Sequence, residues 1–329
     1  MISLYLGENE YKFPNSWEEL TQDQYLAMLP LFQQYSEETI SVSDVKALWF
    51  TDIAGLKGMR VPKKKRNLHA ENIYRMSREF SFMFQIEYPK GSLDNISPDL
   101  RSKLRKTPPE DLEQTPEVRY LSRQDYQYKI DACWCKNLVP DITVGKLKLK
   151  GYTTDLKGNM LQTSMVASQF NLVTELLSQY EASQNKLYLR MIVACLYAPE
   201  GESFNGDLIA DRADQLIGID EIVLDAILLN LQAFLTFIKL KTKWGLLWKH
   251  TPSKKGGVSI GANESLFNLS ERNHGDFEKI DQMPLIKFLD LMLKDLYDAV
   301  KTMKDHEMDV VEIASKAGLS IHQVKQILG

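Results

Sequence analysis

Cysteine is scarce in this chain, which has 3 cysteines among 329 residues. An odd, sparse count without framework spacing provides no disulfide scaffold and is typical of proteins from a reducing compartment. The first residues, MISLYLGENEYKF, also lack the basic region and apolar stretch of a secretion signal. We therefore expect a protein that is cytoplasmic where it is made.

Long uncharged hydrophobic runs are missing too. The most apolar window, residues 216–240, contains Asp220, Glu221 and Asp225. A membrane-spanning helix needs about 20 predominantly apolar residues, so charges at this density favour a buried or amphipathic helix. We expect no membrane span.

The residue patterns of metal and cofactor sites are also lacking. Cys133 and Cys135 flank a tryptophan, but no second cysteine or histidine pair stands at zinc-ligand spacing, and the five histidines stand singly. The glycines of KKGGVSIGANES lack the Lys-Ser/Thr that ends a phosphate-binding loop. We expect no metal, no cofactor and no enzymatic activity.

What the chain does contain is an ordinary globular composition, with 44% hydrophobic and 26% charged residues. Its net charge of −4 argues against a protein built mainly to coat nucleic acid, although a local basic patch remains compatible with it. The length predicts two or three domains rather than one small core.

The N-terminal region combines a hairpin signal with helix caps. Apolar residues alternate over 2–13 around a turn-forming Gly-Glu-Asn, which predicts a β-hairpin. Ser16 with Glu19, and Thr21 with Gln24, have the spacing of two successive capping boxes. We expect a short turn followed by the first substantial helix.

Further helices and a connector are expected downstream. Pro30 should kink or split the first helix, and Asp44 should cap a helix over 45–53. Residues 70–83 have a helical pattern. The segment 88–118 carries five prolines among charges, which is typical of a connector or an extended arm.

The central region predicts another hairpin and more helices. Residues 125–138 look helical, and 146–150 alternate as an exposed strand. The turn residues of 151–158 then predict a hairpin that returns at 160–161. From 163 to 248 the pattern is strongly helical.

These patterns predict a mainly α-helical protein with small β-hairpins, of the α+β class. The expected parts are a hairpin plus helices (1–87), a proline-rich connector (88–118), a hairpin plus helical core domain (119–250), a mobile Gly/Ser-rich loop (251–276), and C-terminal helices, broken near Pro284, that end in a helix-turn-helix-like unit (277–329).

The densest positive stretch, KGMRVPKKKR, covers residues 57–66. It is compatible with contact to phosphate groups or an acidic partner, but a solvated loop is the interpretation that we favour for such a stretch. The candidate contact residues are Arg60, Lys63, Lys64, Lys65 and Arg66.

A second candidate surface follows the apolar window, where lysines and two tryptophans come together. A basic, tryptophan-bearing segment of this kind can dock on a partner helix or a membrane surface. The alternative is a core helix whose last turn carries cations that suit its dipole. The candidate docking residues are Lys241, Lys243, Trp244 and Trp248.

The last residues, 309–328, have the spacing of a helix-turn-helix. Ala314 permits close helix packing and Gly318 a tight turn, and apolar residues fill a shared core. The second helix would cover 320–328. Binding to DNA is less strongly indicated, because a DNA-binding surface normally brings several cations. The side chains on offer are His322, Gln323, Lys325 and Gln326.

The opening FPNSWEELTQDQYLAML resembles the strand–Pro–x–Ser-Trp-Glu-Glu-Leu-Thr–x–x–Gln-Tyr start of proteins from tailed bacteriophages and prophages. The block 163–237, with its turn LYAPEGE at 196–202, is similar to their middle section. The resemblance covers about a third of the chain, and both the proline-rich segment 88–118 and the C-terminal unit lie outside it.

This resemblance implies a non-enzymatic tail, baseplate or tail-assembly protein that acts through protein–protein contacts. Its partners would be other phage structural proteins or copies of itself, in the host cytoplasm during assembly or in the virion. The alternative is a DNA-associated regulator or packaging accessory that uses the C-terminal unit and the basic loop at 60–66.

Overall fold

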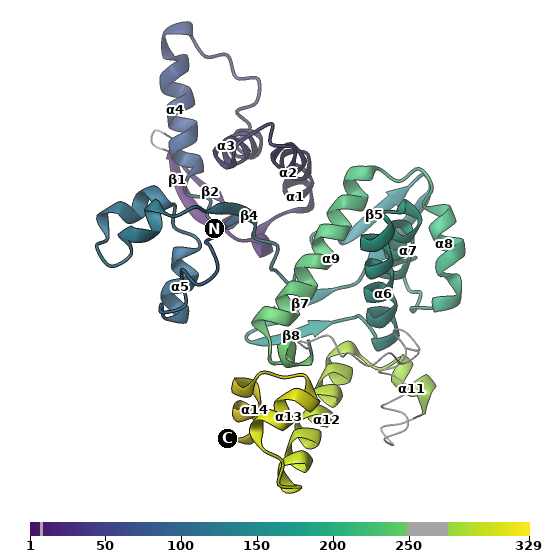
Figure 1. Ribbon diagram of the computed structural model, residues 1–329. Coiled ribbons are helices and arrows are strands. Elements are labelled where there is room, and N and C mark those ends of the chain that lie inside the picture. The colour runs from purple at the N-terminus through teal and green to yellow at the C-terminus, as the bar shows by residue number, and fades with distance from the viewer. Residues whose placement is uncertain (7–8, 249–275) are drawn as a thin grey trace. The chain divides into compact units, whose positions relative to one another are not determined.

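The computed structural model describes residues 1–6, 9–248 and 276–329, and these form two compact units (Figure 1). Unit 1 covers Met1–Ala132 and unit 2 covers Cys133–Gly329. In these residues helices predominate and the strands form small antiparallel sheets, which confirms the α+β class. The predicted Gly/Ser-rich loop at 251–276 lies outside the described residues, apart from its last position.

The described residues of unit 1 form two small sheets and five α-helices. Strands β1 and β2 form the predicted N-terminal hairpin, and β3 pairs with β4. The elements are β1 (Ile2–Leu6), β2 (Asn9–Phe13), η1 (Trp17–Glu19), α1 (Gln22–Leu26), α2 (Leu29–Ser36), α3 (Val42–Ile53), η2 (Lys63–Lys65), α4 (Arg66–Ser77), β3 (Phe84–Glu87), α5 (Pro98–Leu104), η3 (Pro109–Gln114), η4 (Arg119–Arg123) and β4 (Gln127–Ile130).

One of the two predicted capping boxes is present. Thr21 and Gln24 each accept the other's backbone N–H at the start of α1. The box predicted for Ser16 and Glu19 was wrong, because the side chain of Ser16 makes no cap hydrogen bond. Glu19 accepts instead from the backbone N–H of Asn15 at 2.7 Å. The Glu19 carboxylate thus accepts from the residue before the expected N-cap, Asn15 in place of Ser16.

Pro30 separates α1 from α2, as predicted, and lies in the first turn of α2. The prediction that Asp44 caps the next helix was wrong. Ser41 is the N-cap of α3, and Asp44 completes its capping box by accepting the Ser41 backbone N–H at 2.9 Å. A serine three residues before a carboxylate therefore marked the helix start, one turn ahead of the apolar run.

Two of the predicted helices differ from the structure, one in its bounds and one in its type. The helix expected over 70–83 is α4, which begins four residues earlier and ends at Ser77. The helix expected over 125–138 is wrong, because residues 127–130 form β4. Pairing with β3, in which Ile86 faces Tyr128, decides the conformation of this segment.

The segment 88–118 is not an extended arm. Its prolines start short helices, since Pro98 opens α5 and Pro109 opens η3, and proline suits the first helical turn. Apolar residues of this segment and of the neighbouring β3 and η4 pack into a buried cluster made of Ile86, Tyr88, Leu93, Leu104, Leu112, Val118 and Leu121.

Unit 2 begins with strands and continues with helices up to its C-terminal end. Its elements are β5 (Asp141–Val144), β6 (Leu147–Gly151), β7 (Thr154–Lys157), β8 (Met160–Thr163), α6 (Ala167–Ser183), α7 (Lys186–Leu196), β9 (Tyr197–Ala198), η5 (Gly206–Leu208), α8 (Ile209–Gln215), α9 (Glu221–Lys241), η6 (Lys243–Leu247), α11 (Phe277–Asp281), α12 (Leu285–Asp305), α13 (Val310–Ala317) and α14 (Ile321–Leu328).

The strand at 146–150 is confirmed as β6, but its predicted partner was wrong. β6 pairs with β5 and β9, whereas β7 and β8 form a separate hairpin. Gly145 and Gly158 have φ values of +59° and +61°, so each supplies the left-handed residue of a tight turn. Residues 151–158, which were predicted to form a turn, therefore include strand β7.

A buried amide on α9 fixes the interior of unit 2. Asn230 is 2% exposed, and its Oδ1 accepts from the indole N–H of Trp134 and the backbone N–H of Leu138, both at 3.0 Å. Its Nδ2 donates to the Tyr152 hydroxyl at 2.9 Å. The Asn137 amide lies beside it and donates to the Tyr152 carbonyl at 2.9 Å. We call these five residues the Asn230 network.

Gly151 makes room for this network. A Cβ atom at this position would lie 2.7 Å from Asn137 Nδ2 and 2.7 Å from the ring of Tyr197. Tyr197 in turn donates its hydroxyl to the Val139 carbonyl at 2.6 Å. Strand β6 can therefore approach the buried amide only because residue 151 has no side chain.

Helix α9 passes the length and composition test for a membrane span, and it is the one helix in the described ranges that does so. A buried core helix passes the same test. Asn230 lies at the middle of α9 and accepts a hydrogen bond from Trp134 of the same unit. This contact is typical of a helix that packs inside its own domain.

The C-terminal end of unit 2 has a small core of its own. Val300 of α12 packs with residues of α13 and α14, including Ile313, Ala314, Val324 and Ile327. Helices are present at both predicted positions, and the break at Pro284 separates α11 from α12. The assignment of this end as a helix-turn-helix stays a prediction.

We predict that Asn230→Ala lowers the free energy of unfolding of unit 2 by about 2–4 kcal/mol, because the Trp134 indole and the Leu138 amide lose their acceptor while buried. Urea unfolding of the full chain measures this change. Gln232→Ala, a half-buried control on the same helix, should cost less than about 0.5 kcal/mol. Equal losses in the two variants would contradict the role given to Asn230.

Candidate interaction surfaces

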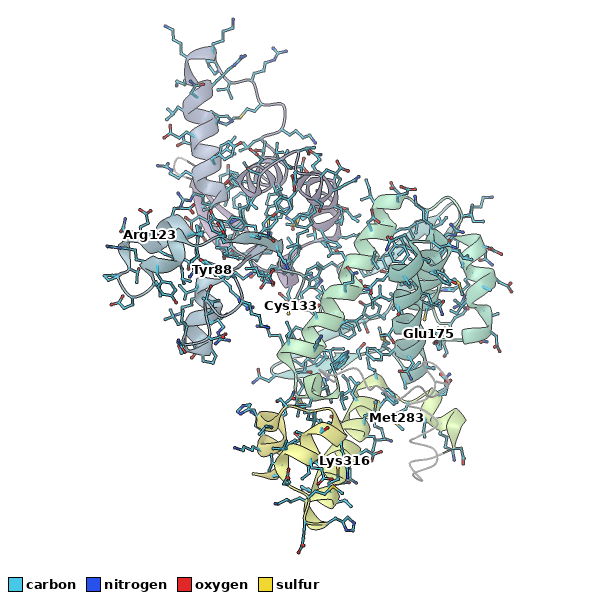
Figure 2. All side chains as sticks on the ribbon, viewed as in Figure 1. Tyr88, Arg123, Cys133, Glu175, Met283 and Lys316 are labelled. Carbon is cyan, nitrogen blue, oxygen red and sulfur yellow. The ribbon has the colours of Figure 1, made fainter. Side chains whose placement is uncertain are left out.

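The predicted basic stretch lies between α3 and α4. Arg60 is in the loop, Lys63, Lys64 and Lys65 form η2, and Arg66 is the first residue of α4. All five side chains are exposed, and Figure 2 shows side chains extending outward at this end of α4. We call these five residues the basic tip.

The positive charge of the basic tip is uncompensated. None of its five side chains has an ion-pair partner in the part of the chain that the structure describes, whereas the neighbouring Lys57 pairs with Asp52 at 3.5 Å. The first turn of α4 contains no acidic residue, so the cations also face the positive end of the helix dipole. Met59 and Leu68 are exposed in the same region. This surface suits an acidic or phosphate-bearing partner.

The residues predicted on α14 are only partly available. His322, Lys325 and Gln326 are exposed. Gln323 is used within the helix, because its Oε1 accepts the Ser320 backbone N–H at 2.8 Å and closes a capping box. The exposed face of α14 therefore offers one lysine, in unit 2, whereas the basic tip belongs to unit 1.

The segment after α9 binds its own chain. Trp244 is 5% exposed, and its indole N–H donates to Asp290 of α12 at 2.8 Å. Lys243 pairs with the same carboxylate at 2.7 Å, and its Nζ lies 5.4 Å from the centre of the Trp244 ring. Trp248 is half-buried and Lys241 is exposed. The contact with α12 favours the core-helix alternative for this segment.

The cysteines lie in and near the core of unit 2. Cys135 and Cys195 are buried and Cys133 is half-buried. Burial raises the pKa of the Cys195 thiol, which therefore stays protonated at neutral pH. Within residues 1–6, 9–248 and 276–329, no group of three or more His, Cys, Asp or Glu side chains stands in reach of one metal ion.

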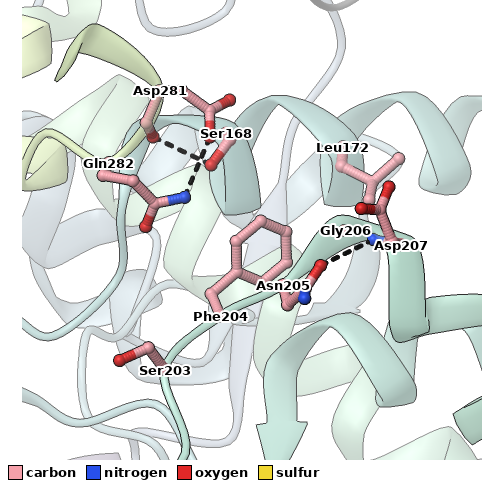
Figure 3. A pocket seen from close by; sticks show the side chains of 9 residues that line it. All are labelled: Ser168, Leu172, Ser203, Phe204, Asn205, Gly206, Asp207, Asp281 and Gln282. Atoms are coloured by element: carbon pink, nitrogen blue, oxygen red, sulfur yellow. Dashed lines mark hydrogen bonds between the residues drawn. The ribbon is translucent and has the colours of Figure 1, made fainter. Parts of the chain in front are cut away.

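A cavity of unit 2 has a volume of about 670 Å³ and lies between the start of α6, the loop before η5 and the end of α11 (Figure 3). Its polar groups bond to one another: the Ser168 hydroxyl donates to the Asp281 carbonyl at 2.8 Å, and Gln282 donates to the Asp281 carboxylate at 2.9 Å. The Asn205 amide accepts from the Asp207 backbone at 2.9 Å. These groups serve the local fold.

A cavity of about 470 Å³ in unit 1 was not foreseen from the sequence. It lies at the start of α3, the end of α4 and β4, and Lys46 lines it; we call it the Lys46 pocket. Burial, followed by the charges of Lys106 and Arg78, lowers the pKa of Lys46 to about 8. The sequence does carry a signal for this residue. Lys46 stands three and four residues before Trp49 and Phe50, on the apolar side of α3.

Comparison with protein-family models, with curated proteins and with solved structures finds no match for this chain.

We predict that Lys46→Met stabilises the protein below pH 8 by about 1–3 kcal/mol, because it removes a desolvated cation and keeps an unbranched side chain of similar length. The pKa of Lys46 is lower in the folded state than in the unfolded state. Stability of the parent protein therefore rises between pH 8 and about 10.5, and the advantage of the variant shrinks over this range.

Thermal unfolding of the parent and variant proteins between pH 6 and pH 10 measures this difference. Lys12→Met, at an exposed position on β2, is the matched control and should change stability by less than about 0.5 kcal/mol at every pH. A Lys46→Met variant that is less stable than the parent at pH 7 would refute the interpretation.

Proposed function

We propose that this chain is a non-enzymatic structural or assembly protein of a tailed-phage-type particle, and that it works through protein–protein contacts. The resemblance of residues 13–29 and 163–237 to phage tail-associated proteins supports this proposal. Its partners are other phage structural proteins or copies of itself, in the host cytoplasm during assembly or in the finished particle.

The residues that carry the resemblance contribute mainly to the fold. Trp17 is 4% exposed and packs edge-on against Tyr25 and Phe82, with ring centres 6.3 and 5.1 Å apart. Trp17 is therefore not available to a partner. The observation that carries the proposal is the basic tip, where uncompensated cations stand beside the exposed Met59 and Leu68. Mixed apolar and charged surfaces of this kind are typical of contacts with acidic protein surfaces.

The second candidate function is that of a DNA-associated regulator or packaging accessory. The unpaired cations of the basic tip favour it, because lysine and arginine neutralise phosphates. The C-terminal unit, which is the proposed helix-turn-helix, gives it little support. Its α14 exposes one lysine, and 301–329 contains 4 lysines and 4 acidic residues. We therefore favour the protein-contact function.

We predict that the tagged full chain retains a phage structural protein, identified by mass spectrometry, from lysates of cells that assemble the particle. The triple variant Lys63→Glu, Lys64→Glu and Lys65→Glu should retain less than about a tenth as much of this partner as the parent protein does, since it reverses the charge of the tip. The control Lys301→Glu, Lys304→Glu and Lys325→Glu makes the same charge change in unit 2 and should retain it. Equal recovery by both variants, or recovery of no phage structural protein, would count against the proposal.

We also predict no tight binding of the parent protein to duplex DNA at about 150 mM salt, because the net charge of the chain is −4 and α14 exposes one lysine. Gel shift and fluorescence anisotropy at several salt concentrations measure this affinity. Tight binding that weakens steeply with salt, and is lost on deletion of 305–329, would replace the protein-contact function with the DNA-associated one.

A further inference from the structure

The Lys46 pocket brings polar side chains from five parts of unit 1 to one cavity. Lys46 and Ser43 come from α3, and Tyr74 and Arg78 from the end of α4. Tyr35 comes from α2, Glu110 from η3 and Tyr128 from β4. The cavity of about 470 Å³ is large enough for a small ligand. Its residues lie outside the basic tip, so the pocket is a separate site.

Lys46 is the cation of this pocket that has no ion-pair partner among the described residues, although the charge of Glu110 acts on it. Its ammonium group has no hydrogen bond or ion pair to any residue within 1–6, 9–248 or 276–329. The cations beside it have carboxylate partners of their own. Arg78 bonds to Asp111 at 3.1 Å and lies 4.0 Å from Glu110, and Lys106 pairs with Asp131.

Two acidic groups are near the pocket: Glu110 lines it beside Arg78, and Asp44 adjoins it. Asp44 accepts hydrogen bonds from Ser41 and from the Tyr74 hydroxyl, and these bonds hold the pKa of its carboxyl below the ordinary value. A partly buried lysine without a partner is unfavourable, because burial removes water from the charge. An anion placed in the cavity would offset that penalty.

Hydrogen-bond donors for such an anion line the cavity. The hydroxyls of Ser43 and Tyr128 make no hydrogen bond to another described residue. Burial raises the pKa of Tyr128, so its hydroxyl remains a donor at neutral pH. The first turn of α3, which includes Val42 and Ser43, adds backbone N–H groups that a helix leaves without an internal acceptor.

We propose that the Lys46 pocket binds a small oxyanion, a carboxylate or a phosphate, with the Lys46 ammonium as its charge partner and with Ser43 and Tyr128 as hydrogen-bond donors.

Binding depends on pH in a defined direction. Below about pH 8 Lys46 is already protonated, and the anion meets a full positive charge. A bound anion stabilises this charge and raises the pKa of Lys46, so binding above pH 8 requires uptake of a proton and becomes weaker. The charged groups that act on Lys46 are Arg78, Lys106 and Glu110. The pocket tyrosines stay neutral, because burial raises the pKa of Tyr35 and the bond to Asp44 raises that of Tyr74.

The first test measures the pKa of Lys46 directly. The lysines of the full chain are labelled by reductive ¹³C-methylation, and the Lys46 signal is assigned by its loss in Lys46→Arg. Titrations are run in chloride alone, with inorganic phosphate and with acetate, at one ionic strength. We expect phosphate or acetate to raise the pKa of Lys46 by more than about 0.5 unit and to leave the Lys12 signal unchanged. A Lys46 signal that responds to neither anion would overturn the proposal.

Calorimetric titration of the full chain with the same anions is the second test. Lys46→Met should abolish saturable binding, Ser43→Ala should weaken it several-fold, and Lys12→Met should leave it unchanged. Tighter binding of phosphate than of acetate would identify a phosphate ligand. Tighter binding of acetate, or of a peptide rich in glutamate, would identify a carboxylate. Saturable binding that survives in Lys46→Met would refute the assigned site.

Discussion

The side-chain amide of Asn230 is the interaction on which the interior of unit 2 depends. Its oxygen and nitrogen join α9 to the segment around Trp134 and to Tyr152, three parts of the chain that are distant in sequence. An unsatisfied amide in an apolar helix would be unfavourable, so only a packing that brings all of its partners together is stable. The amide thereby selects the position of α9, and Gly151 admits β6 to the same place.

Unit 1 is organised by rings instead of a polar network. Trp17, Trp49, Phe80 and Phe82 are buried and meet mostly edge-on, an arrangement that aromatic pairs favour. This core includes Trp17 of the N-terminal segment that resembles phage proteins. A substitution of Trp17 therefore acts on stability before it acts on binding.

Local signals predicted much of this fold. Thr21 and Gln24 marked a helix start, and Pro30 and Pro284 separated helices where expected, because these effects operate within a few residues. The failures involved distant partners. Residues 127–130 became a strand because β3 pairs with them, and the proline-rich segment closed on its own apolar residues.

The candidate sites divide in the same way. The exposure of the basic tip was compatible with its composition, and its role as a contact surface stays a prediction. The indole of Trp244 donates a hydrogen bond to Asp290, 46 residues away in the sequence. No sequence pattern indicated this contact. The Lys46 pocket was missed because its lining comes from five separated segments. Only the lysine itself, on the apolar side of α3, could have been noticed in advance.

Helix α4 joins these two surfaces, since it begins in the basic tip and ends beside the Lys46 pocket. Ser77 is its one buried residue, and a helix of 12 residues is marginally stable in water without tertiary support. Repulsion between the helix dipole and the cations at this end, Arg66 and the preceding lysines of η2, favours fraying of the helix start. An anionic surface that neutralises the tip would relieve this repulsion, so partner binding and helix order would be thermodynamically linked. Helix α4 would then be more ordered in the bound protein than in the free one.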